Sequence, residues 1–262
     1  MSKKLRKEKI EEVTQDYYTT FGIASLPVTH IVTNDMKKTY TDIRPDFAAK
    51  NPDKMATVQM YNGLMVPPVE LDGTFTVLLN YSYVLDSLRK KDMNWVGTIA
   101  HETTHINDYI EYARLINEPS YDQLQSIDEH GMFQLWTEWN ARAKGYYFVR
   151  KYTFNDLHDD QQVKDIMKIE LPAQSKLLAQ NYSSTQSGFQ QAYYVAHYLG
   201  RLHTLQQLFP GSFTNKYIQD HLRPNDWMYD WFEFFCKYNK LSEVYEHFEE
   251  MKDILRQNFK GL

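Results

Sequence analysis

The chain has 262 residues, which is enough for one large domain or two small ones with a true hydrophobic core. Its 29 Lys and Arg against 34 Asp and Glu give a formal net charge of −5, which argues against sequence-independent binding of nucleic acid. Aromatic residues make up 15% of the chain, which argues against disorder, and no apolar run reaches the ~18 residues of a membrane span.

The amino-terminal part of the chain predicts one helix and a small sheet. Residues 1–20 have apolar side chains at helical spacing, and these predict one buried side made of Leu5, Ile10, Val13 and Tyr17. Strand-like segments follow at 28–33, 55–61 and 74–80. Turn-forming pairs, among them Asn51-Pro52 and Asn62-Gly63, separate these segments and favour a largely antiparallel sheet.

From about residue 92 onward, nearly every segment has helical periodicity. Helices are predicted over 94–117, 122–151, 160–181, 186–208, 214–221, 226–238 and 241–258. Pro119 and Pro210 each follow one of these segments, where a proline marks the end of a helix. The expected fold class is therefore α+β, with a small amino-terminal antiparallel sheet followed by a mainly helical body.

Residues His101 to His105 spell the motif H-E-x-x-H. Four residues advance an α-helix by about 400°, so the two histidines lie about 40° apart around the axis and one turn apart along it. Two neutral imidazoles on one helical face can bind a single Zn²⁺ ion. Glu102 is rotated away from His101 by about 100°, so its carboxylate can instead take the proton of a water that the metal acidifies.

The segment around this motif predicts one uninterrupted helix, because it contains no proline before Ile116. One side of this helix is apolar and is expected to be buried, with Ile99, Ile106, Ile110 and Ala113. Another face carries the polar residues Thr98, His101, His105 and Asp108. The two histidines are therefore expected to share a face with Asp108.

A catalytic zinc needs a third protein ligand and one open position. Glu111 has the spacing of the metzincin pattern, but that pattern needs a glycine where this chain has Asp108, so the helix should continue and carry Glu111 away. Glu138 is the stronger candidate. It lies among apolar residues of the next predicted helix, where an unpaired carboxylate would be costly to bury.

Other assignments of these polar residues stay open. Glu138 could instead be exposed, or form a salt bridge with Arg142. Asp128, Glu129 and His130 stand at the start of the same helix and are alternative ligands, although such residues are more typical of helix capping.

The H-E-x-x-H motif, followed by Glu138-Trp139-Asn140-Ala141 on a downstream helix, resembles the gluzincin class of zinc metallopeptidases. The matching part covers about 45 residues. The resemblance implies that His101, His105 and Glu138 bind zinc. It also implies that Glu102 acts as general base and then as general acid.

The resemblance has further implications for the rest of the chain. Residues 1–152 would form a zincin-like catalytic core, and residues 153–262 a helical subdomain that completes the cleft. The strand over 74–80 would pair with an extended peptide substrate. Many members of the class carry an aspartate where this chain has Arg142, and Asp108 could take over its role of orienting a ligand histidine.

The predicted helix over 186–208 carries candidates for stabilising a tetrahedral oxyanion. Tyr193, His197 and Arg201 fall at i, i+4 and i+8, and Tyr194 stands beside them. The alternative for the same residues is aromatic packing with an exposed histidine and arginine.

The only cysteine, Cys236, lies in an aromatic stretch and is expected to be a buried, unreactive thiol. The charged amino terminus does not resemble a secretory signal, so we expect a soluble cytoplasmic protein that binds neither membranes nor nucleic acid. The predicted function is zinc-dependent hydrolysis of a peptide or protein substrate. The alternative is a regulatory or binding protein that retains a zinc-peptidase-like scaffold without proteolysis. The sequence leaves the substrate and the oligomeric state open.

Overall fold

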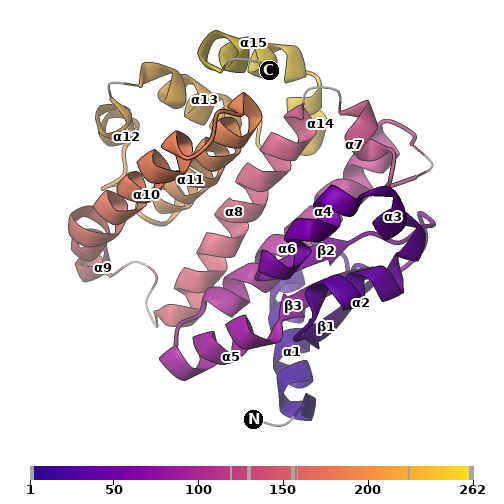
Figure 1. Cartoon of the computed structure of the whole chain (residues 1–262). Coiled ribbons are helices and arrows are strands. Elements are labelled where there is room, and N and C mark those ends of the chain that lie inside the picture. Colours follow the sequence, from indigo (N-terminus) through magenta and orange to yellow (C-terminus); the bar gives the residue numbers. More distant parts are fainter. Residues whose placement is uncertain are drawn as a thin grey trace. The chain divides into compact units, whose positions relative to one another are not determined.

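The computed structural model describes residues 3–118, 120–128, 131–154, 157, 159–223 and 225–259 (Figure 1). The α+β prediction is confirmed, because a small sheet near the amino terminus is followed by mainly helical elements. Within the ranges given above, no helix combines the length and the apolar character needed to cross a membrane.

The chain forms two compact units. The first contains Met1–Leu124 and Phe148–Thr153, and the second contains Gln125–Tyr147 and Phe154–Leu262. This division differs from a cut after residue 152, because the long helix α8 (Met132–Thr153) contributes residues to both units.

The sheet of the first unit has three strands, β1 (Val28–Thr33), β2 (Gly63–Val66) and β3 (Phe75–Asn80). Their order is β1-β3-β2, with β1 parallel and β2 antiparallel to β3, so the sheet is mixed rather than antiparallel. The central strand β3 is almost wholly buried, as expected of a continuous apolar strand that is covered on both faces.

The strand predicted over 55–61 is wrong. This part of the chain forms the helices α3 (Pro45–Lys50) and α4 (Pro52–Thr57), followed by the 3₁₀ turn η1 (Val58–Met60). Pro45 and Pro52 each begin a helix, where the missing N–H of proline is no loss and its fixed φ suits the helix. The proline signals therefore mark helix starts, and not the turns of hairpins.

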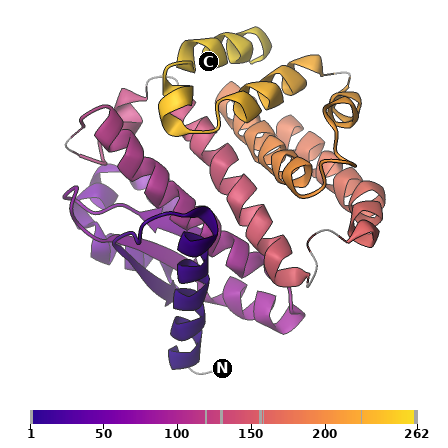
Figure 2. The same cartoon turned by 180° about the vertical axis from the view of Figure 1, so that it is seen from behind.

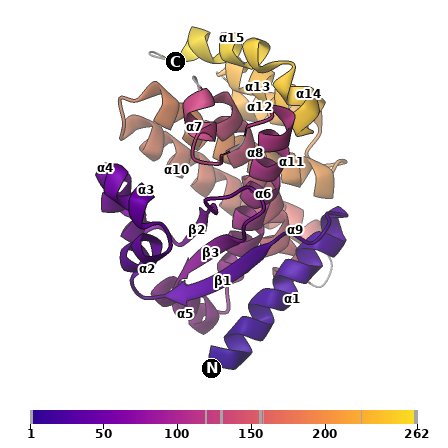
Figure 3. The ribbon, with the colours of Figure 1, turned by 90° about the vertical axis from the view of Figure 1, so that its right-hand side faces the viewer.

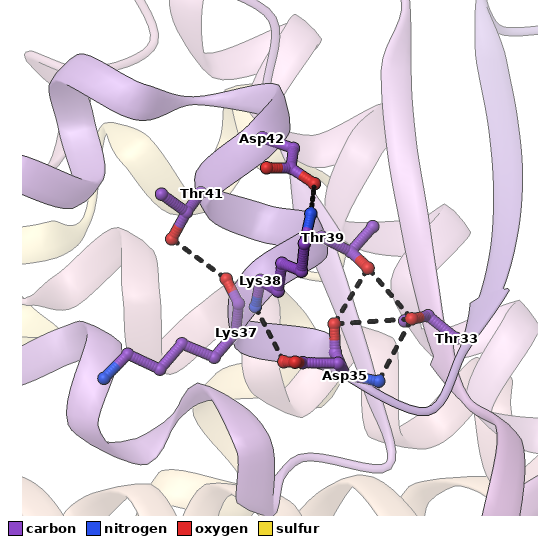
Figure 4. A network of polar contacts seen from close by, with 7 residues as sticks. All are labelled: Thr33, Asp35, Lys37, Lys38, Thr39, Thr41 and Asp42. Atoms are coloured by element: carbon purple, nitrogen blue, oxygen red, sulfur yellow. Dashed lines mark hydrogen bonds and ion pairs between the residues drawn. The ribbon is translucent and has the colours of Figure 1, made fainter.

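The helix α2 (Met36–Ile43) begins at the polar network drawn in Figure 4. The Asp35 carboxylate accepts a hydrogen bond from the backbone N–H of Lys38 at 2.8 Å and so caps the first turn. The hydroxyl of Thr33, at the end of β1, accepts from the Asp35 N–H at 3.1 Å, and Thr39 donates to the Asp35 carbonyl at 2.8 Å. These bonds set the turn from β1 into α2.

Helices cover both faces of the sheet. A core cluster joins α2, α3, α4 and η1 to β2 and β3, and its buried members are Met36, Tyr40, Ala48, Met55, Val58, Val66 and Leu78. The helices α6 (Asn94–Leu115) and α5 (Tyr81–Lys90) pack against the sheet as well, and α1 (Lys3–Phe21) packs on α6. Figure 3 shows α2 and α3 on one side of the sheet and α1 on the other.

The buried side predicted for the amino-terminal helix is confirmed for three of its four residues. Ile10, Val13 and Tyr17 are at most 3% exposed in α1. The side chain of Leu5 lies outside the described residues.

The second unit is helical, and several predicted helices are interrupted. The helix predicted over 122–151 is α7 (Leu124–Ile127) and α8, separated by a turn in which Gly131 has a φ of +69°. The remaining elements are α9 (Asp160–Asp165), the π-helical turn η2 (Ile166–Glu170), α10 (Leu171–Ser183), α11 (Gly188–Leu208), α12 (Asn215–Leu222), α13 (Asp226–Lys237), α14 (Leu241–Tyr245) and α15 (Phe248–Asn258).

A close helix crossing organises the second unit. A Cβ atom added at Gly200 of α11 would lie 2.5 Å from the Trp139 carbonyl oxygen of α8, so only glycine permits this approach. The Thr204 hydroxyl donates to the Ala143 carbonyl at 2.8 Å one turn further along. The helices α10 and α11 pack side by side after a short turn (Figures 1 and 2). This crossing holds α11 against the part of α8 that carries Glu138.

Candidate metal centre

His101 and His105 lie together on α6, as the motif predicts. Their Nε2 atoms are 3.0 Å apart, and their rings are perpendicular with centroids 4.6 Å apart. Two nitrogens that bind one zinc at ~2.0–2.1 Å with tetrahedral angles would be about 3.3 Å apart. The pair therefore nearly has the geometry needed to bind a single metal ion.

Two buried threonines lie within the motif, and one of them links α6 to α1. Thr103 and Thr104 are fully buried and donate to the carbonyls of Ile99 and Ala100, one turn earlier. Since the Thr104 hydroxyl proton is used in this way, its oxygen accepts from the Tyr17 hydroxyl of α1 at 2.9 Å. This anchor fixes the rotation of α6 and so determines where the two histidines point.

Glu102 is held by the edge of the sheet. Its Oε2 accepts a hydrogen bond from the backbone N–H of Met65 in β2 at 2.8 Å, and the residue is 7% exposed. Gly63 allows β2 to approach this closely, because a Cβ atom there would lie 2.3 Å from the Thr98 side chain. The candidate base is therefore tied to the edge strand β2.

The remaining polar residues of α6 take different positions. Asp108 is 1% exposed and lies close enough to Tyr17 to contribute, after burial, to raising the pKa of its hydroxyl well above its ordinary value. Glu111 is exposed and accepts from the Asn107 amide at 3.0 Å, on a helix that continues unbroken past it. The prediction that the helix continues past Asp108 and carries Glu111 along it is thus confirmed.

Glu138 lies on α8, in the second unit, and has a definite partner there. Its Oε2 is 2.7 Å from Nε2 of His197 on α11. On the other side of the same imidazole, a guanidinium nitrogen of Arg142 is 3.0 Å from Nδ1. The three side chains form a row in the order Arg142, His197, Glu138.

Burial and neighbouring charges shift the pKa values of the basic groups in and beside this row. Burial, and after it the positive charge of Arg142, lower the pKa of His197 to about 4, although Glu138 acts in the opposite direction. Burial also lowers the pKa of Arg201 to about 10, with Arg142 as the next cause. The imidazole of His197 is therefore neutral at physiological pH.

The residues on α11 that were candidates for oxyanion stabilisation make different contacts. His197 is engaged with Glu138 and Arg142, while the Tyr193 ring packs on the His197 ring at 4.3 Å. Tyr194 is partly exposed and packs edge-on against Tyr193. The alternative of aromatic packing holds for the two tyrosines, but His197 and Arg201 are partly buried and not exposed as that alternative expects.

The alternative ligands at the start of the third-ligand helix are only partly described. Asp128 accepts from the backbone N–H groups of Phe133 and Gln134 at 3.1 and 3.0 Å, which confirms its capping role for α8. Glu129 and His130 lie outside the described residues.

The expected substrate strand must be corrected. The predicted segment 74–80 forms β3, which is the central strand and is paired with β1 and β2 along its two edges. A strand paired on both sides has no backbone groups left for a peptide. The edge strand on the side of Glu102 is β2, which the sequence does not predict because Asn62-Gly63 indicates a turn at its start. The short apolar run Leu64-Met65-Val66 was the available signal.

Cys236 is half-buried, whereas the sequence predicts a fully buried thiol, and its predicted lack of reactivity agrees with its surroundings. Burial raises the pKa of its thiol to about 12, and its sulfur lies 3.3 Å from Nδ1 of His203. A thiol of this kind is protonated and unreactive at physiological pH.

Comparison with known proteins adds no family assignment. No protein-family model, curated protein sequence or solved structure matches this chain. Any function must therefore be argued from the residues and their geometry.

Proposed function

We propose that this protein is a zinc-dependent hydrolase that cleaves a peptide bond. The observation that carries the proposal is the His101–His105 pair, whose Nε2 atoms are 3.0 Å apart on one face of α6, with the buried Glu102 between them in sequence. Two imidazoles and a neighbouring carboxylate of this kind are the donor and base types that a hydrolytic zinc site uses.

We propose Glu138 as the third ligand, because Glu138-Trp139-Asn140-Ala141 downstream of the H-E-x-x-H motif resembles the third-ligand helix of the gluzincins, and because His197 orients the Glu138 carboxylate within the second unit. Two imidazole nitrogens and one carboxylate oxygen fit zinc and leave a position for the reacting groups. A bound zinc would polarise the scissile carbonyl and acidify a water molecule.

The chain's own residues supply the remaining steps. The Glu102 carboxylate takes the proton of the attacking water and then delivers it to the leaving amine. The Met65 N–H donates to one oxygen of this carboxylate and so orients it. The single cysteine is consistent with a reducing cytoplasm as the proposed compartment.

The test combines metal content with turnover. Mass spectrometry of the purified wild type is expected to find about one zinc per chain, and His101→Ala and Glu138→Ala are both expected to lose it. Glu102→Gln should keep the metal but cleave a quenched fluorescent peptide library at least about a hundredfold more slowly, since a general base contributes about 10²–10⁴-fold.

Other outcomes would separate the parts of the proposal. A wild type without zinc after reconstitution would refute the metal site. Zinc retained in Glu138→Ala would refute the third ligand alone. Bound zinc with no turnover on peptides or proteins would indicate the regulatory or binding protein instead.

A further inference from the structure

The row formed by Arg142, His197 and Glu138 determines where the imidazole proton lies. A guanidinium group offers only N–H donors, so Nδ1 of His197, 3.0 Å from Arg142, must accept. The single proton of the neutral imidazole is then on Nε2, which donates to Oε2 of Glu138 at 2.7 Å. Arg142 thereby selects the one tautomer that can hold Glu138.

This bond uses one oxygen of Glu138 and sets the plane of the carboxylate. Both partners are largely buried, with 18% of the His197 side chain and 17% of the Glu138 side chain exposed. The close crossing at Gly200 holds the two helices at a fixed separation. The carboxylate is therefore pre-oriented before any metal binds.

The imidazole also separates two opposite charges. A guanidinium in direct contact with Glu138 would form a strong bidentate pair and would compete with a metal ion for both oxygens. With His197 between them, the contact of Glu138 on this side is with the neutral imidazole and not with the guanidinium.

We propose that His197, held in one tautomer by Arg142, is the positioning residue for the third zinc ligand Glu138. The proposal rests on the proposed metal site and gives His197 a role other than oxyanion stabilisation. Groups that orient a metal ligand in this way typically contribute about 10–100-fold to metal affinity.

The test measures zinc affinity, by competition with a chromophoric chelator, and needs no substrate. His197→Leu removes the donor and is expected to weaken zinc binding about 10–100-fold. His197→Gln can still donate an N–H to Glu138 and is expected to stay within about threefold of the wild type. Arg142→Met frees the tautomer choice, so it should weaken binding less than His197→Leu does.

The control is His203→Leu, which removes another partly buried histidine from α11 and should leave zinc affinity unchanged. Thermal melting of each metal-free variant checks that it folds. Equal affinities for His197→Leu and the wild type would overturn the positioning role and leave the metal site intact. Equal losses in His197→Leu and His197→Gln would also overturn it, because the effect would not depend on the donor. A wild type that binds no zinc would overturn both proposals.

Discussion

At the scale of single residues, the polar groups of the proposed site are oriented from outside the motif. The Met65 N–H holds Glu102, the Tyr17 hydroxyl anchors Thr104, and His197 holds Glu138. The H-E-x-x-H spacing predicts the two histidines and the base. None of their orienting partners could be predicted from it, because they are 37 to 87 residues away along the chain.

The bond between Met65 and Glu102 can be tested with proline. The Met65 N–H bonds to Glu102, and a proline is tolerated on an edge strand where its nitrogen faces away from the ladder. Met65→Pro should destabilise the fold by about 1–3 kcal/mol, because a buried carboxylate loses a donor. Chemical denaturation measures this loss. Met65→Ala keeps the N–H and serves as control. A loss of the same size in a Glu102→Ala background would show that the bond is not its cause.

The partly buried His203 predicts the acid sensitivity of the fold. Burial lowers the pKa of His203 to about 4, below its ordinary value near 6.5, so the folded state favours the neutral ring. The contribution of the neutral His203 ring to the unfolding free energy is fully present above about pH 6.5 and is lost as the pH falls towards 4. His203→Phe should flatten the fall in unfolding free energy between pH 6.5 and 4.5, while a substitution of the partly exposed His247 should not. An unchanged pH profile in His203→Phe would contradict the assignment.

At the scale of elements, the sequence predicts well those helices whose apolar spacing is uninterrupted. It predicts poorly the short segments that are separated by proline and glycine. The predictions for α6 and α11 agree with the structure to within two residues at each end. The strand prediction over 55–61 is wrong because proline is common both in the first turn of a helix and in β-turns, and the sequence does not distinguish the two. Only the packing of these short helices on the sheet selects between the two.

The close crossing of α8 and α11 predicts an intolerance at Gly200. A Cβ atom there meets a backbone oxygen at 2.5 Å, which cannot move aside as a flexible side chain would. Gly200→Ala should cost about 1–3 kcal/mol of stability and should weaken zinc binding, because the helices that carry Glu138 and His197 move apart. Denaturation and chelator competition measure the two effects. Gly211→Ala is the matched control, since nothing lies within 4 Å of its added Cβ. Equal results for the two variants would contradict this account.

At the scale of the whole molecule, composition sets the electrostatic character. With a net charge of −5 and a pI near 6.0, the chain is expected to show no retention on heparin or on immobilised duplex DNA at 0.15 M salt and pH 7.5. Chromatography of the wild type in rising salt checks this. Retention that weakens steeply with salt would instead indicate a local basic surface.

Local sequence patterns account for the α+β class, the position of α6 and the pairing of His101 with His105 on one of its faces. These follow from local periodicity, since residues three or four apart on a helix are neighbours whatever the rest of the chain does. Only the tertiary structure decided the mixed sheet, the edge strand β2 beside Glu102, and the use of His197 and Arg142 around Glu138. These contacts join residues distant along the chain, and their formation depends on the packing of whole helices and strands, which no local spacing encodes.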